Sequence, residues 1–575
     1  MKFPRIILPA VLAVALPVHA DWVERSDAIT LELMRAQGPF APEERSSVGL
    51  AQFDPEVMEI SESARRAELA VNREQIQRLS AMLETEQDSR VRQDVEILVQ
   101  ALQRANTTSE LEHQYLLPFV DVHDLVFGSI NSLLDPRVAA ERRPAVLERL
   151  RKYNGRAPGY QPITEMARQF SSERFGVAGL VGPYRGAVEN AVEKAPLVLD
   201  GLHTLLAESE LSGWEDDYAL LAQQLEAYTQ WLRDSMLPRA REENRLPPAL
   251  YANALKEYGV DMSPQALIAQ GQYSYQLLRS QMQVLAAEIA QQRNWEQRDL
   301  LSVLAALKAE QLAPEQVLPT YLDTLEKLEA IIRRENIVSL PERAASIREA
   351  TAAESAAMPA SYMSPPQLVN NTGQYGEFVL VQKNPALGES SQMDDFSHAA
   401  YAWTLTIHEV RPGHELQFSS MVEEGVSLAR ATYAFNSANA EGWALYAESV
   451  MLPYLPPEGQ LFALHSLSWR AARMFLDPMV NTGQLSRDGA RDFLMRELLM
   501  SEPMASSEAD RYAYRMPGQA TSYYFGFVTL MGLRTELSMA LGERFNQMTF
   551  HDFILQQGLL PPDMLREEVR AEFLL

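Results

Sequence analysis

The chain has 575 residues, no cysteine and a formal net charge of −26. This length is too great for one hydrophobic core, so we expect two or more lobes. The absence of cysteine excludes disulfides, thiolate nucleophiles and cysteine-rich metal clusters, so a metal site would have to use histidine and carboxylate. The negative charge argues against nucleic acid and anionic lipid as partners.

Residues 1–20 have the layout of a secretory signal peptide. Two basic residues precede an apolar segment at 6–16, and Val18 and Ala20 are the small residues that a signal peptidase needs. The apolar segment is too short to span a bilayer comfortably, which disfavours the alternative of an N-terminal membrane anchor. We therefore expect a soluble mature protein, periplasmic or secreted, with no membrane contact after signal cleavage.

The pattern from residue 21 to about 350 is helical and predicts a scaffold lobe. Apolar residues recur at helical intervals in four segments, 67–105, 197–232, 249–293 and 300–334. We interpret the histidines of this part as structural rather than as ligands; they are His113, His123 and His203.

A change of composition at residues 351–367, which are rich in Ala, Ser and Pro, indicates a boundary before a catalytic lobe at 351–575. The best strand candidate follows at 376–382. The expected fold is therefore mainly α, a two-lobed zincin-like body with a small β element around 376–382 beside the active-site helices. An extended peptide could add to an exposed edge of that strand.

The chemistry begins at His408 and Glu409, at the end of a helix that Asp394 or Asp395 is expected to open. Metallopeptidases commonly use His-Glu-x-x-His, because positions i and i+4 lie one above the other on a helix. Here the second histidine, His414, is six residues from the first. In a regular helix that spacing turns the two side chains about 120° apart, too far to share a metal.

The two extra residues come with Pro412 and Gly413, which interrupt a helix and accept unusual dihedrals. A bulge there would bring His414 back to the position expected at i+4. The alternative is a helix that ends at Arg411, followed by an unrelated histidine.

A third ligand is required, because catalytic zinc takes three protein ligands and water. Glu441 and Glu448 lie seven apart on one predicted helix, capped by Ser437 or Asn439, and so project from one face. We expect Glu441 to bind the metal and Glu448 to orient a histidine, the alternative for Glu448 being a solvated surface carboxylate. His398, out of phase with His408, is left out of the metal group.

These motifs, His408-Glu-x-x-Pro-Gly-His414-x-x-Gln417 and Glu441-Gly-Trp-Ala-Leu-Tyr-Ala-Glu448, resemble those of a bacterial domain-of-unknown-function family. That family is similar to helical zinc peptidases, namely thermostable carboxypeptidases, angiotensin-converting-type dipeptidases and thimet-type oligopeptidases. The resemblance implies a two-lobed helical body with a deep channel and His, His and Glu around zinc. Those relatives close the first motif with i+4 spacing, and this chain does not. Gln417 is a candidate near the site.

A third matching block contains Arg511, Tyr512, Arg515 and Tyr523. A peptidase of this kind needs a donor for the oxyanion of the tetrahedral intermediate. Tyr523 is the first candidate, with Tyr512 and Tyr524 as alternatives, and Arg511 or Arg515 could hold a substrate carboxylate. For any single tyrosine the alternative is core packing.

The sequence thus predicts an exported peptidase that uses one Zn²⁺, although two histidines and a carboxylate suit other divalent metals too. Glu409 is the expected general base, and a peptide or small amide is the expected substrate. Two rivals remain: a zinc hydrolase of a non-peptide amide or ester, and a catalytically inactive peptide-binding relative.

Overall fold

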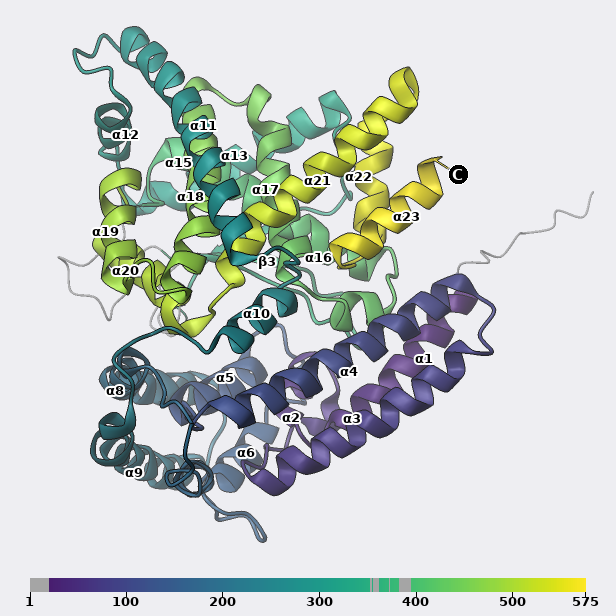
Figure 1. The fold of residues 1–575 in the computed structure, drawn as a ribbon, viewed down its shortest axis with the longest axis vertical. Coiled ribbons are helices and arrows are strands. Elements are labelled where there is room, and N and C mark those ends of the chain that lie inside the picture. The colour runs from purple at the N-terminus through teal and green to yellow at the C-terminus, as the bar shows by residue number, and fades with distance from the viewer. Residues whose placement is uncertain (1–19, 352–353, 355–360, 372, 382–394, 575) are drawn as a thin grey trace, which may run out of the picture.

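The computed structural model describes residues 20–351, 354, 361–371, 373–381 and 395–574, and it is mainly helical with one small sheet (Figure 1). Residues 1–19 of the expected signal peptide lie outside these described residues, as does Asp394. No helix in the described part of the chain is both long and apolar enough to cross a membrane.

The N-terminal helices form one group in the lower part of Figure 1. Residues 33–102 of this group share a buried cluster with Ala429, and residues 117–236 form most of a separate core. Apolar residues at helical spacing explain this core: Val122, Val126, Ile130 and Leu133 lie on one face of one helix, and all four are buried. The helices of this group are α1 (Ala20–Gln37), α2 (Pro42–Ser47), α3 (Glu62–Leu83), α4 (Ser89–Tyr115), α5 (Val122–Leu134), α6 (Ala145–Tyr153), α7 (Ile163–Ser172), α8 (Arg185–Glu208) and α9 (Glu215–Trp231).

The remaining helices form a second group, in the upper part of Figure 1. They are α10 (Pro248–Glu257), α11 (Pro264–Gln292), α12 (Leu300–Lys308), α13 (Pro314–Glu335), α15 (Ala399–Glu409), α16 (His414–Glu423), α17 (Ser437–Met451), α18 (Pro457–Asn481), α19 (Arg487–Leu498), α20 (Glu502–Asp510), α21 (Gln519–Leu541), α22 (Gln547–Gln556) and α23 (Pro562–Leu574).

The helices group differently from the division at residue 350 that the sequence predicted. Helices α10–α13 share one buried cluster with the helices that follow residue 395, and Tyr321, Leu405 and Phe475 are all members of it. Helical periodicity shows that a face is buried but not which partner covers it, so the sequence pattern alone could not assign these helices to one core or the other.

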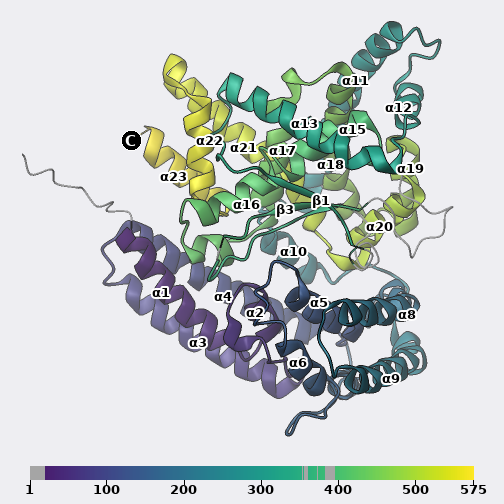
Figure 2. The same ribbon diagram turned by 180° about the vertical axis from the view of Figure 1, so that it is seen from behind.

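The sheet lies between the two groups of helices, close to α16 in Figure 2. Its strands are β1 (Ser346–Glu349), β2 (Tyr362–Ser364) and β3 (Glu377–Leu380), in the order β1-β3-β2, with β1 parallel and β2 antiparallel to β3. The strand predicted at 376–382 is therefore β3. It is the central strand, and both of its edges are paired, so the expectation that a peptide could add to it is wrong.

Candidate metal centre

The backbone between the two histidines is a break between two helices rather than a bulge within one. Helix α15 ends at Glu409, with the amides of Val410 and Arg411 both donating to the Thr406 carbonyl, at 3.0 and 3.2 Å. The Arg411–Pro412 peptide bond is cis, and α16 begins at His414. Proline cannot donate to the preceding turn, which accounts for the end of α15.

Gly413 permits the close approach of these two helices. A Cβ atom at this position would lie 2.0 Å from the carbonyl oxygen of His408 and 2.3 Å from that of Ile407. On the other side, the indole of Trp443 in α17 donates to the Pro412 carbonyl at 2.9 Å. The loop is thus held between the last turn of α15 and the helix that carries the third candidate ligand.

Arg411 anchors the same loop, a role that was not predicted from the sequence. Its side chain is fully buried, and Nε donates to Glu415 at 3.1 Å while Nη2 donates to the Arg343 carbonyl at 3.0 Å. Nη1 pairs with Glu329 of α13. An arginine that bonds to two carboxylates and a carbonyl in this way fixes the loop in position, because its buried charge is stabilised only where these partners surround it.

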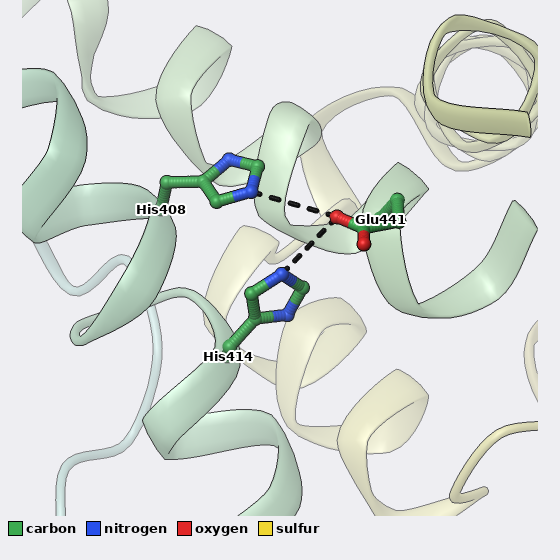
Figure 3. Close-up of side chains that lie close together, drawn as sticks. All are labelled: His408, His414 and Glu441. Carbon is green, nitrogen blue, oxygen red and sulfur yellow. Dashed lines mark hydrogen bonds and ion pairs between the residues drawn. The ribbon is translucent and has the colours of Figure 1, made fainter. Parts of the chain in front are cut away.

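His408, His414 and Glu441 converge on one point, as Figure 3 shows. The Nε2 atoms of His408 and His414 lie 3.5 and 3.2 Å from Oε2 of Glu441, and all three ligand atoms fall within 4.8 Å of one another. Tetrahedral zinc with ligands at about 2.0–2.1 Å separates its ligand atoms by about 3.3 Å. These three side chains could therefore hold a metal ion between them.

Glu448 lies behind His408 and is fully buried, unlike the solvated carboxylate that was the alternative. Its Oε1 accepts from Nδ1 of His408 at 2.7 Å, which leaves Nε2 of the same ring directed toward the candidate metal position. Burial opposes the charge on His408, but hydrogen bonds with Glu441 and Glu448 outweigh it and raise the pKa of His408 to about 9. Burial likewise favours neutral Glu441, yet hydrogen bonds from both histidines hold its pKa well below the usual range.

Helix α17 presents Glu441 to the histidines, and its position depends on close packing against α21. A Cβ atom on Gly526 would lie 1.8 Å from the Ala438 carbonyl, so the two helices touch backbone to backbone there. The N-cap of α17 is Asn436, which accepts from the Asn439 amide, and not Ser437 or Asn439 as predicted. Gln417 is buried and donates to the Asn439 side chain at 3.0 Å, so it joins α16 to α17.

Glu409 contacts the sheet rather than another helix. Its Oε2 accepts from the backbone amide of Met363 at 3.1 Å, and Met363 belongs to the outer strand β2. Helix α15 begins at Ala399, and Asp395 is not its cap but pairs with Lys308 at 2.9 Å. His398 packs against Phe462, with ring centroids 4.5 Å apart and ring planes tilted by 56°, and is not part of the metal group.

The structure brings only some of the residues of the third block into contact with one another. Arg511 donates to the Tyr523 hydroxyl at 3.2 Å, and both side chains are largely enclosed. Tyr512 is buried and donates to Glu508 at 3.0 Å, while Tyr524 is buried near Ser274 of α11. Arg515 is exposed and pairs only weakly with Asp510, at 4.0 Å, so it does not join this cluster.

A set of buried polar and charged residues on α18 was not predicted from the sequence. Ser466, Arg470, Arg473 and Asp477 follow one another at intervals of four, three and four residues, so they occupy one face of an otherwise apolar helix. Charged residues at helical spacing inside an apolar segment were the signal that could have revealed them. Arg473 forms a paired bond with Glu508, at 2.7 and 2.8 Å.

A cavity of about 980 Å³ lies between the two groups of helices. Its walls include Arg45 and Asn131 from the N-terminal group, Tyr362 of β2, and Phe418 of α16. The ring of Phe418 lies 6.2 Å from that of His414, so the cavity is one side chain away from the candidate ligands.

Comparison with known proteins identifies a family and several similar structures, two of which are described here. A family model described as a bacterial protein of unknown function (DUF885) matches residues 42–569. A structure described as a putative lipoprotein of unknown function from Shewanella oneidensis aligns with a TM-score of 0.74 at 18% identity, covering 96% of this chain and 99% of that one. A second, described as the putative lipoprotein from Colwellia psychrerythraea, aligns with a TM-score of 0.77 at 16% identity and the same coverage. No curated protein matches.

Proposed function

Because the chain belongs to the DUF885 family of bacterial proteins of unknown function, we propose its function from the site: it is an exported zinc peptidase that hydrolyses short peptides. The observation that carries the proposal is the convergence of His408, His414 and Glu441 at the spacing of a tetrahedral zinc site. The buried Glu448 behind His408 supports it, because metal-binding histidines commonly donate their other nitrogen to a carboxylate.

Zinc held by these residues would acidify a water molecule and polarise the scissile carbonyl. Glu409, next to His408 in the chain, is the general base that accepts the proton of the attacking water and delivers it to the leaving amine. The Met363 amide binds one of its carboxylate oxygens and leaves the other to carry the proton.

Tyr523 is the proposed donor to the oxyanion. Its hydroxyl oxygen accepts from Arg511, which leaves the hydroxyl hydrogen available for a substrate oxygen. Tyr512 is less suitable, because its hydroxyl hydrogen is already donated to Glu508.

The wider proposal is a zincin-like body of two lobes around a substrate channel. Its support is the cavity of about 980 Å³ between the two groups of helices, which is at the upper end of the size of known ligand pockets. Export is part of the proposal because residues 1–20 read as a signal peptide and because the two similar structures are described as lipoproteins.

The experiment uses the variants Glu409→Gln and Glu441→Ala with a library of short peptides and with amides and esters of similar size. We expect Glu409→Gln to retain zinc but lose about 10²- to 10⁴-fold in kcat, and Glu441→Ala to lose zinc. Normal hydrolysis by Glu409→Gln would remove the general base from the proposal. Turnover of esters without any peptide turnover would favour the non-peptide hydrolase instead.

A further inference from the structure

Part of the cavity between the two groups of helices is an apolar wall beside the candidate metal centre. Phe418, which lines the cavity, lies four residues after His414 on α16, so both side chains project from the same face of that helix. Phe418 and Leu368, which also lines the cavity, pack against a small buried cluster that includes Ala440. Ala440 directly precedes Glu441 in α17. The apolar wall thus adjoins the segments that carry two of the three candidate ligands.

A second phenylalanine lines the same cavity and is left open to it. Phe435 lies between the helical turn Ala429–Tyr433 and Asn436, the N-cap of α17. Its side chain is 52% exposed. A phenylalanine ring in water forgoes the stabilisation that burial of its apolar surface would give, and a ligand that covers the ring would restore it.

The cavity also reaches the strand that holds the proposed general base. Tyr362 of β2 lines it, and the next residue, Met363, donates its amide to Glu409 at 3.1 Å. The cavity therefore borders the proposed reaction site along α16 and along β2.

The charges around the cavity disfavour an acidic occupant. Its lining contains five carboxylates, those of Glu44, Asp135, Glu208, Glu210 and Glu354, and only three guanidinium groups, those of Arg45, Arg137 and Arg143. Glu208, the last residue of α8 in the lower group of Figure 1, and Glu210 form no ion pair within the described part of the chain. The last turn of α8 carries no basic residue, so the partial negative charge of its C-terminus adds to these two carboxylates.

We propose that this cavity is the specificity pocket of the proposed peptidase, in which Phe418 and Phe435 receive a large apolar side chain, aromatic or long aliphatic, of the peptide substrate. The inference rests on the proposed function and gives it a substrate class: short peptides that carry a large apolar residue close to the bond that is cut. Apolar and aromatic walls with a few polar groups are what ligand pockets commonly have. Burying a phenylalanine side chain against two aromatic rings favours it over alanine by at least about tenfold in affinity.

The test measures the binding of pentapeptides of alanine and serine in which each position in turn carries Phe, Ala or Glu. The protein is zinc-loaded Glu409→Gln, which should bind a substrate without cutting it, and affinity is measured by isothermal titration calorimetry. We expect a Phe side chain at one position or more to bind at least about tenfold more tightly than Ala at that position. Glu should bind no more tightly than Ala.

Phe435→Ala, added to the same protein, should lower the ratio of Phe to Ala affinity by at least about threefold. The matched control is Tyr273→Ala, which removes an aromatic ring that is 72% exposed on α11 and does not line the cavity; it should keep the ratio. Because Phe435 is itself half exposed, its replacement removes no core packing.

Equal affinity for Phe and Ala peptides at every position would overturn the pocket, as would the absence of binding. A ratio unchanged in Phe435→Ala would overturn the role of Phe435, and tighter binding of Glu peptides would overturn the argument from charge. Hydrolysis of the same peptides by the wild type separates this inference from the proposed function. A Phe preference in binding without any cleavage would leave the pocket standing and remove the peptidase, whereas cleavage without any preference would do the reverse.

Discussion

Replacing Gly413 by alanine tests the claim that a close approach of two helices brings the histidines together. The added Cβ atom would lie 2.0 Å from the His408 carbonyl oxygen, whereas ordinary contacts of this kind begin at 3.4 Å. Both of the nearest atoms are backbone atoms of the last turn of α15, which cannot swing aside as a side chain could. The start of α16 would therefore have to move by about 1 Å or more, and His414 would move with it.

The size of the effect follows from the tolerance of metal coordination. Zinc–ligand distances vary by only about 0.2 Å between good sites, so a displacement of about 1 Å removes His414 from the ligand set. Loss of an outer-shell partner alone costs about 10- to 100-fold in affinity. We therefore expect Gly413→Ala to weaken zinc binding by at least about 100-fold, or about 2.7 kcal/mol, measured by competition with a chromophoric chelator.

Gly532→Ala is the matched control, because a Cβ atom at that position in α21 would meet no atom within 4 Å. It should bind zinc as the wild type does and be as stable or more so, since alanine favours a helix over glycine. Circular dichroism and thermal unfolding in the presence of chelator separate a folding defect from a metal defect. Zinc affinity unchanged in folded Gly413→Ala protein would refute the geometric reasoning.

The sequence was sufficient for the helical character of the fold, for its family and for the small β element. The sequence was not sufficient where contacts between residues far apart in the chain determine how helices and strands are arranged. Periodicity predicted helices at 249–293 and 300–334, but not that these pack with the C-terminal half instead of the N-terminal one. Similarly, a strand at 376–382 could be predicted, whereas its central position depends on β1 and β2, which precede it in the chain.

In the candidate site, the sequence was enough to predict which residues take part, but not which side chains they contact in three dimensions. Pro412 and Gly413 indicated that the backbone must depart from a regular helix, although the outcome is two helices and not a bulge. The seven-residue spacing of Glu441 and Glu448 placed both on one face, but only the fold shows that Glu448 is buried against His408. Arg411 lies in the motif itself, yet its partner Glu329 is 82 residues away, so no local pattern could reveal the pair.

Two further predictions concern buried carboxylates. Glu448→Gln should weaken zinc binding about 10- to 100-fold, because a neutral amide orients His408 less firmly than the carboxylate does; unchanged affinity in the same chelator competition would contradict this. Glu508 is the second case: burial raises its pKa, but Arg473 and Arg511 outweigh burial and lower it to about 2 from 4.5. Because the folded-state pKa is the lower one, the stabilisation is complete above about pH 4.5 and is lost as the pH falls toward 2. The free energy of unfolding of the wild type, relative to Glu508→Gln, should therefore drop by about 1.4 kcal/mol between about pH 5.5 and about pH 3.5 in urea titrations. A difference that stays constant over this range would show that the two arginines do not stabilise a charged Glu508.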